Sequence, residues 1–248
     1  MTDKASNSEW LDAELFSPFQ KEQALLYEHA EWVAARAFLK MVNLPFGLEQ
    51  RPNAEFMSPD GSVPFLKLQK TLVFGYLNIV EFVSQKGIKL TNTLSEADIA
   101  DMNALMALIR ENLLNAEKYF CWSESSNYHS VTKRRYGSVY PVPLKWWLPY
   151  LKRKDIVSQL NDSGFANKTI DDVVKKAETV FHALSVKLGN QRYFMGDEPT
   201  ELDALAFGHI FSILTIELPS NHLATALRKH ANLMNFCIAI DEELFKLD

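Results

Sequence analysis

The residue types best suited to catalysis or metal binding are few and widely separated in this chain. There are two cysteines and six histidines. No two histidines form an HxxxH or HExxH pair, and Cys121 and Cys237 lie in apolar stretches outside any CxxC or Cys/His spacing. The nine glycines include no Walker loop, GxGxxG or GxSxG motif. The sequence therefore gives no support to metal, nucleotide or hydrolase chemistry, and predicts that both cysteines are buried thiols in a reducing compartment.

His209 is the histidine that lies within the longest apolar stretch, Ala204 to Leu218. It could act as a base or a ligand, but we interpret it as a structural residue because no carboxylate or cysteine accompanies it in the sequence. The stretch is shorter than the roughly 18 apolar residues of a membrane-spanning helix, and it contains Glu217. If the protein belongs at a membrane, we expect something else to hold it there.

One segment combines positive charge with aromatic side chains. Between Lys133 and Lys154 there is no acidic residue, and the basic residues are Lys133, Arg134, Arg135, Lys145, Lys152, Arg153 and Lys154. Trp146 and Trp147 lie in the same segment, and its three prolines predict a loop with short helical pieces. We expect these nine residues to form a membrane-facing or partner-facing surface, because cations and tryptophans favour the headgroup level of an anionic membrane. The alternative is that the aromatic residues pack inside and the charges are simply solvated.

Composition restricts the remaining function classes. The formal net charge is −5, which excludes the electrostatic pattern of a nucleic-acid binder for the chain as a whole. With 248 residues, 47% of them hydrophobic, the chain can form one large domain or two ordinary ones. The first 22 residues carry several acids and no apolar core, so we expect neither a secretory signal nor a transit peptide, and folding in the cytosol.

Periodicity predicts a small α/β module followed by a larger all-helical one. The first module reads as strand Ala24 to Tyr27, helix Ala30 to Val42, strand Phe46 to Arg51, a turn at Pro59-Asp60-Gly61, a hairpin of Val63 to Leu68 with Thr71 to Phe74, and helix Leu77 to Gln85. The second reads as helices Ser95 to Cys121, Ile170 to Leu188, Glu201 to Leu218 and Ala231 to Phe245. We therefore expect an N-terminal extension at 1–22, a first domain at 23–87 and a second at 95–248.

This layout resembles the glutathione transferase superfamily, which joins a thioredoxin-like domain to a helical C-terminal domain. Val63-Pro64 stands where that superfamily has a proline, typically cis, that starts a strand. Thr200 and Asp203 can form a reciprocal capping box, which the superfamily buries in its helical domain. We assign structural roles to Pro64, Thr200 and Asp203.

Longer strings resemble the metaxin family, in its type-2 branch. They are Arg51 to Phe65, Arg135 to Ser138 with Tyr140-Pro141, and Pro199 to Leu205 with Phe207 to His209, and the likeness runs from about Gln23 to about Phe245. The resemblance implies a peripheral protein on the cytosolic face of the mitochondrial outer membrane, with no cofactor. It implies a heterodimer with membrane-anchored type-1 metaxin, and a link to the sorting and assembly machinery that inserts β-barrels. For mitochondrial transport, it implies mitochondrial Rho GTPase and kinesin motor adaptors as partners.

The glutathione transferase superfamily also implies a place for an active site, and this sequence departs from it. A transferase needs a donor near the glutathione sulfur, just after the first strand, where Tyr27 stands beside Glu28 and Glu31. The superfamily holds the γ-glutamyl end with an acid or Gln followed by Ser, but Gly75-Tyr76 occupies that pair here. We expect a non-catalytic adaptor. The alternatives are a glutathione-dependent transferase that uses Tyr27, and a soluble, transferase-like signalling protein.

Overall fold

The N-terminal part of the chain is built on a four-stranded sheet. The computed structural model describes residues 10, 12–59 and 61–246. The strands β1 (Ala13–Ser17), β2 (Gly47–Gln50), β3 (Phe65–Leu68) and β4 (Thr71–Phe74) lie in the order β2-β1-β3-β4. β1 pairs parallel with β2 and antiparallel with β3, and β3 pairs antiparallel with β4. The predicted hairpin and the predicted strand around β2 are confirmed.

The predicted first strand, Ala24 to Tyr27, is wrong. The first strand is β1, within the segment 1–22 that the sequence assigned to an extension, and Leu26 and Tyr27 begin helix α3 (Leu26–Met41) after the short helix α2 (Gln20–Gln23). The apolar run at Ala24 was misread because it continues into the helical period, with Leu26, Ala30 and Val33 on one buried face. Residues 1–9 and 11 of the extension, and Asp60 of the predicted turn, lie outside the described residues.

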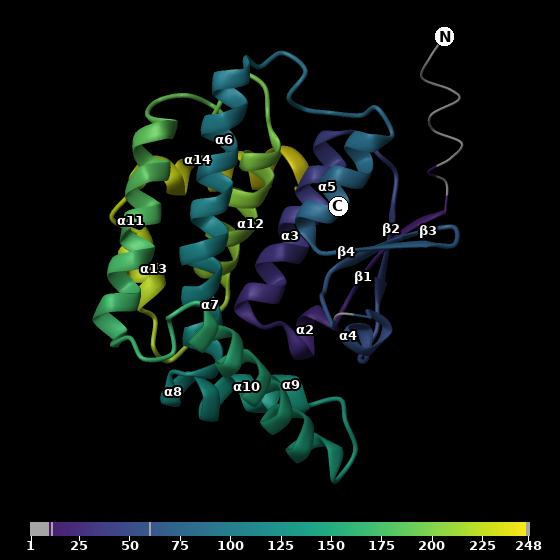
Figure 1. Ribbon diagram of the computed structural model, residues 1–248, viewed down its shortest axis with the longest axis vertical. Coiled ribbons are helices and arrows are strands. Elements are labelled where there is room, and N and C mark those ends of the chain that lie inside the picture. Colours follow the sequence, from purple (N-terminus) through teal and green to yellow (C-terminus); the bar gives the residue numbers. More distant parts are fainter. Residues whose placement is uncertain (1–9, 11, 60, 247–248) are drawn as a thin grey trace.

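Two further helices complete the N-terminal part, α4 (Ala54–Met57) and α5 (Tyr76–Gln85). Helix α5 begins after Gly75, whose φ of +74° is a left-handed conformation that a side chain would disfavour. The helix ends before Gly87, which has a φ of +86°, as expected for a residue that closes a helix. In Figure 1, α3 and α5 lie between the sheet and the helical bundle.

The C-terminal part is helical, as predicted. The long predicted helix Ser95 to Cys121 is present as α6 (Glu96–Leu108), the π-helical segment η1 (Ile109–Leu113) and α7 (Leu114–Trp122). It is followed, after the arm described next, by α11 (Ile170–Leu188), α12 (Glu201–Thr215), α13 (His222–Leu227) and α14 (Ala231–Leu244). Helix α12 is buried over nearly its whole circumference and packs mainly against α3, so it joins the two parts of the core. Within the described residues, no helix combines the length and apolar character needed to cross a bilayer.

Residues 133–162 form an extension of two helices that we call the arm. It contains α9 (Lys133–Gly137) and α10 (Leu144–Asp162), and follows α8 (Ser125–Asn127) and the π-helical segment η2 (Tyr128–Thr132). The arm lies at the lower end of the molecule in Figure 1. The predicted loop with short helical pieces is wrong for most of this segment, because α10 is a 19-residue helix that includes Pro149.

Pro149 lies in α10 at the point where the neighbouring helix α9 comes close. Because Pro149 has no N–H group, the carbonyl of Lys145 has no donor four residues later. That carbonyl faces Gly137 of α9, where an added Cβ would lie only 2.6 Å from it. The absence of a side chain at Gly137 therefore allows α9 to approach α10 closely beside Pro149.

Candidate functional site

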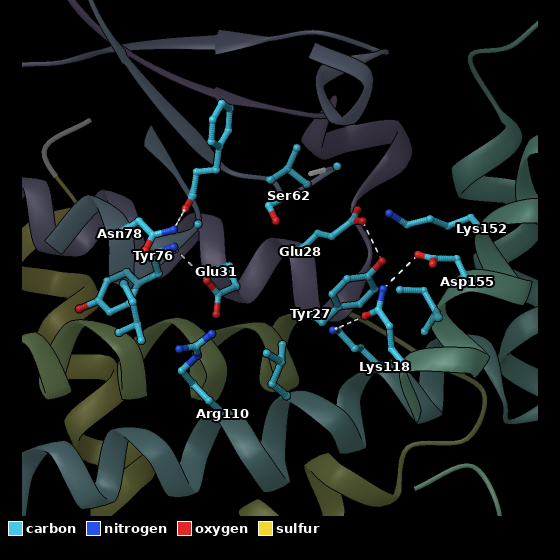
Figure 2. A pocket seen from close by; sticks show the side chains of 18 residues that line it. Tyr27, Glu28, Glu31, Ser62, Tyr76, Asn78, Arg110, Lys118, Lys152 and Asp155 are labelled. Atoms are coloured by element: carbon cyan, nitrogen blue, oxygen red, sulfur yellow. Dashed lines mark hydrogen bonds between the residues drawn. The ribbon is translucent and has the colours of Figure 1, made fainter. Parts of the chain in front are cut away.

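A cavity lies between the sheet part and the helical part, at the position where the resemblance places a ligand. Its volume is about 420 Å³. The polar residues that line it are Tyr27, Glu28 and Glu31 of α3, Ser62, Tyr76 and Asn78 of α5, Arg110 of η1, Lys118 of α7, and Lys152, Asp155 and Gln159 of α10. Figure 2 shows the acidic side chains of α3 facing the basic side chains of the other helices across the cavity.

The Tyr27 hydroxyl group is hydrogen-bonded to a neighbouring carboxylate and is not free to donate to a ligand. Its hydroxyl donates to Glu28 Oε1 at 2.8 Å and accepts from Trp122 Nε1 at 3.4 Å. Burial, followed by the charge of Glu28, raises the pKa of Tyr27 well above its ordinary value. A hydroxyl that must stabilise a thiolate should point at the sulfur and be free to donate to it. The geometry therefore disfavours Tyr27 as a thiol-activating residue.

The N-terminus of α5 is filled by a side chain of the protein itself. The Tyr76 backbone N–H donates to Glu31 Oε2 at 3.2 Å, and Gly75 contributes no side-chain hydrogen bond to the helix start. A helix N-terminus attracts anions, so the Glu31 carboxylate takes the place that a ligand carboxylate would use. The ring of Tyr76 is buried, and its hydroxyl donates to the Glu201 carbonyl at 2.5 Å. The contact with Glu31, labelled in Figure 2, links residues 45 positions apart and was missed from the sequence.

Glu55 fastens the arm to the N-terminal part. The Lys152 ammonium group lies 3.0 Å from Glu55 Oε2, with both side chains largely buried, and the Tyr136 hydroxyl donates to Glu55 Oε1. Burial lowers the pKa of Lys152, but Glu28 and Glu55 more than offset this and leave it raised. Glu55 was not identified from the sequence, because nothing local marks it as the partner of residues about a hundred positions away.

The nine residues expected on a membrane-facing or partner-facing surface separate into two groups. Lys133, Arg134, Lys145, Trp146, Trp147 and Lys154 are exposed. The other three make internal contacts: Lys152 pairs with Glu55, the Arg153 Nε donates to the Trp122 carbonyl at 2.9 Å, and the Arg135 guanidinium donates to the Ala24 carbonyl at 3.0 Å. Three of the basic residues therefore attach the arm to the rest of the protein.

The three residues with assigned structural roles occupy the expected positions. The Val63-Pro64 bond is cis, and the Pro64 carbonyl accepts from the Gly75 N–H at 2.9 Å. Thr200 and Asp203 form the predicted capping box at the start of α12, and both are buried. Burial raises the pKa of Asp203 to about 6, against the hydrogen bonds from Thr200 and Phe194 that lower it.

His209 has a buried carboxylate partner that the sequence did not reveal. Its Nδ1 lies 2.9 Å from Glu117 Oε1 of α7, and both side chains are completely buried. Burial lowers the pKa of His209, but the Glu117 carboxylate outweighs this and raises it. The available signal was Glu117 itself, a carboxylate within the apolar stripe of Leu113 and Phe120. The pair joins α12 to α7 within the core, as expected for a structural role.

The two cysteines are buried free thiols, as predicted. Burial raises the pKa of both Cys121 and Cys237 to about 12, so neither is a thiolate near neutral pH. Among residues 10, 12–59 and 61–246, no three His, Cys, Asp or Glu side chains are grouped so that they could hold a metal ion.

Glu28 should make stability depend on pH. Burial raises the pKa of its carboxyl group from 4.5 to about 7, against the opposing charge of Lys152. Because folding disfavours the ionised form, this contribution to stability is complete below pH 4.5 and is lost as the pH rises through about 7. Glu28→Gln is neutral at every pH and can still accept the Tyr27 hydrogen bond. The variant should therefore gain on the order of 2 kcal/mol of unfolding free energy relative to the wild type between about pH 5 and about pH 8.

Urea unfolding of both proteins at the two pH values measures this change. Glu111→Gln, at an exposed carboxylate, is the matched control and should track the wild type. A difference between Glu28→Gln and the wild type that is equal at both pH values would contradict the assignment.

The sequence is similar to two known protein families and to curated proteins. Residues 33–153 match the family described as outer mitochondrial membrane transport complex protein, and residues 177–240 match the glutathione S-transferase C-terminal domain. The chain is 48% identical over 208 residues to the Metaxin-2 homolog of Caenorhabditis elegans. The aligned region covers 84% of this chain and 90% of the relative. It is 40% identical to mouse Metaxin-2 over 243 residues, 98% of this chain and 92% of the relative.

A solved structure agrees on the fold. The β-etherase of Sphingobium sp. strain SYK-6 superposes with a TM-score of 0.63 at 13% identity, over 96% of this chain and 100% of that one. At so low an identity the likeness concerns the fold alone. The expected fold, a small thioredoxin-like domain followed by a glutathione transferase-like helical domain, is confirmed.

Proposed function

The chain belongs to the metaxin family, in its type-2 group, and from this premise we propose that it is a non-catalytic adaptor subunit of a metaxin complex on the mitochondrial outer membrane. The family's description as an outer-membrane transport complex supports an import-related role at that membrane. The finer proposal is a peripheral protein on the cytosolic face that pairs with a membrane-anchored type-1 metaxin. In that complex it takes part in the sorting and assembly of β-barrels, or in the transport of mitochondria, or in both. For transport, its partners are the mitochondrial Rho GTPase and kinesin motor adaptors.

The observation that carries the non-catalytic part is the contact between Glu31 and the start of α5. A glutathione-dependent enzyme leaves this helix N-terminus open for the ligand carboxylate. Here the Glu31 carboxylate accepts the Tyr76 N–H, and Tyr27 is bonded to Glu28. The two places where a transferase meets its ligand are thus filled by the protein's own carboxylates. A fold kept as a scaffold while function moves to its surfaces accounts for this arrangement.

Affinity purification of the tagged chain from gently solubilised mitochondria tests the proposal. We expect stoichiometric recovery of a type-1 metaxin together with assembly-machinery or motor-adaptor proteins, because an adaptor is defined by its partners. The tag alone is the control. A chain that fractionates with the cytosol and brings down no partner, even where type-1 metaxin is present, contradicts the proposal and favours a soluble signalling protein.

The enzyme alternative has a separate test. The purified chain should not be retained on immobilised glutathione and should not conjugate a generic electrophile, whereas an active glutathione transferase run in parallel does both. Retention of this chain would show that Glu31 yields the α5 N-terminus to the ligand, and would return the transferase reading that uses Tyr27.

A further inference from the structure

The tip of the arm exposes a dense group of large apolar side chains. Residues 142–151, which we call the arm tip, carry six of the twelve large hydrophobic side chains that are exposed in the described part of the chain. Their exposed fractions lie between 45% and 60%, and they are Val142, Leu144, Trp146, Trp147, Tyr150 and Leu151. A soluble surface normally scatters such residues singly. Six within ten consecutive positions therefore indicate a contact surface.

The exposed residues share one face of α10. Trp146, Trp147, Tyr150 and Leu151 lie at i, i+1, i+4 and i+5, which places them together on one side of the helix. The same side continues one turn later with the exposed Lys154. The opposite side holds the buried Pro149 and Ile156, where α10 packs against α9 and α7. Within the part of the chain that the structure describes, no helix or strand therefore covers the apolar face of the tip.

Two basic residues of α10 join the arm to the rest of the protein next to the tip. Lys152 is paired with the buried Glu55 at 3.0 Å. The Arg153 guanidinium lies 4.0 Å over the Tyr128 ring and also donates to a carbonyl of α7. A surface fixed in this way loses little conformational freedom when it meets a partner.

The charges of the arm favour an anionic bilayer as the binding partner of the tip. The exposed residues of the arm include the cations Lys133, Arg134, Lys145 and Lys154. No acidic residue lies between positions 133 and 154, although the whole chain has a net charge of −5. The Lys145 ammonium group lies 5.4 Å from the Trp146 ring centroid. Tryptophan and tyrosine flanked by lysine are typical of a helix that lies in the headgroup region, whereas the cores of protein interfaces are depleted in lysine.

We propose that the arm tip, residues 142–151, inserts into the headgroup region of an anionic membrane, with Trp146 and Trp147 as its anchors and Lys145 and Lys154 on the lipid phosphates. The inference rests on the proposed function, which places the chain at a membrane, and it adds the surface by which the chain touches lipid directly. The Val142 and Leu144 side chains, which the sequence did not identify, widen the apolar contact at the end of the helix.

Vesicle binding by the purified full-length chain tests the proposal. Vesicles of phosphatidylcholine with phosphatidylserine should co-sediment the wild type, and vesicles of phosphatidylcholine alone should bind it much less. The double variant Trp146→Ser with Trp147→Ser should bind about tenfold more weakly, because the interfacial anchors are lost. Lys145→Glu with Lys154→Glu should weaken binding to the anionic vesicles to a similar extent, and added salt should weaken the wild type.

A matched control removes exposed apolar side chains from other helices. Val186 and Ile238 are 67% and 55% exposed on α11 and α14, so Val186→Ser with Ile238→Ser should bind vesicles like the wild type. Every variant should keep its thermal midpoint, since all the altered side chains are exposed. Brominated lipid quenches tryptophans that it contacts. It should quench the wild-type fluorescence through Trp146 and Trp147, which are exposed, whereas Trp10, Trp32 and Trp122 are buried.

The outcomes separate this inference from the proposed function. A wild type that ignores anionic vesicles, or a tryptophan variant that binds them equally well, overturns the inference. If the tryptophan variant binds vesicles normally but loses type-1 metaxin in the purification from mitochondria, the tip is a protein docking surface and only the proposed function stands. If the wild type recovers no metaxin partner, the proposed function fails, whatever the vesicles show.

Discussion

Gly208→Ala should lower the thermal midpoint by about 10 °C, which corresponds to a loss of about 3 kcal/mol of unfolding free energy. Gly208 lies where α12 crosses α3. A Cβ added there would stand 2.3 Å from the Ala30 carbonyl oxygen and 2.7 Å from the Ala34 Cβ. Both distances are shorter than atoms can approach, and the first obstacle is backbone, so one helix must move away from the other.

Helix propensity predicts the opposite sign for this substitution. Within a helix, alanine is more favourable than glycine by about 1 kcal/mol. Packing should outweigh this gain, because α12 and α3 form the main contact between the two parts of the protein. Gly208→Val, which adds two more carbon atoms at the same crossing, should leave no soluble folded protein.

Thermal unfolding followed by circular dichroism measures the effect, with Gly47→Ala as the control. At Gly47 the nearest atom to an added Cβ is 3.8 Å away, an ordinary contact distance, so that variant should stay close to the wild type. If Gly208→Ala were as stable as the wild type, the two helices could not cross as closely as the structure has them.

Asp203→Ala should cost a similar amount, about 3 kcal/mol, because it leaves several buried donors without an acceptor. The Asp203 carboxylate accepts the Phe194 N–H at 2.8 Å, the Thr200 N–H at 2.8 Å and the Thr200 hydroxyl at 2.6 Å. Asp203→Asn keeps one acceptor oxygen and should lose less stability than Asp203→Ala. Urea unfolding at neutral pH provides the measurement.

The chain offers a matched control for this capping box. Thr169 and Asp172 form the same Thr-x-x-Asp pair at the start of α11, with the Thr169 hydroxyl 2.7 Å from the Asp172 carboxylate, but this pair is exposed to solvent. In Asp172→Ala, water can replace the lost acceptor, so the loss of stability should be clearly smaller. Equal losses for Asp172→Ala and Asp203→Ala would mean that burial does not set the cost.

Local patterns were enough to predict most helices and two structural sites. The Thr200–Asp203 capping box involves residues three positions apart, and a helix start requires nothing more distant than that. The helical domain followed from apolar residues at spacings of three and four, including α11 and α14. The strings around Pro64 and Gly208 were sufficient to identify the family, because long runs of specific residues are rare by chance.

The prediction of secondary structure was wrong where a short apolar segment fits both a strand and a helix. Ala24 to Tyr27 is an apolar run that suits either a strand or a helix start. Its last two residues begin α3, and β1 is the strand that pairs with β2. Pro149 was expected to break regular structure, but α10 is helical on both sides of it, and Gly137 of the neighbouring helix packs closely beside this turn.

The sequence by itself determined the family, the order of the longer helices other than α10, and the local caps, since each depends on residues within a few positions of one another. The folded chain decided the rest. It brought the Glu31 carboxylate to the start of α5, paired Glu117 with His209, and tied Lys152 to Glu55, which leaves the apolar tip of the arm exposed. These pairs are 45 to 97 residues apart, and a charge buried by tertiary packing selects its partner by proximity in space, which no spacing along the chain reveals.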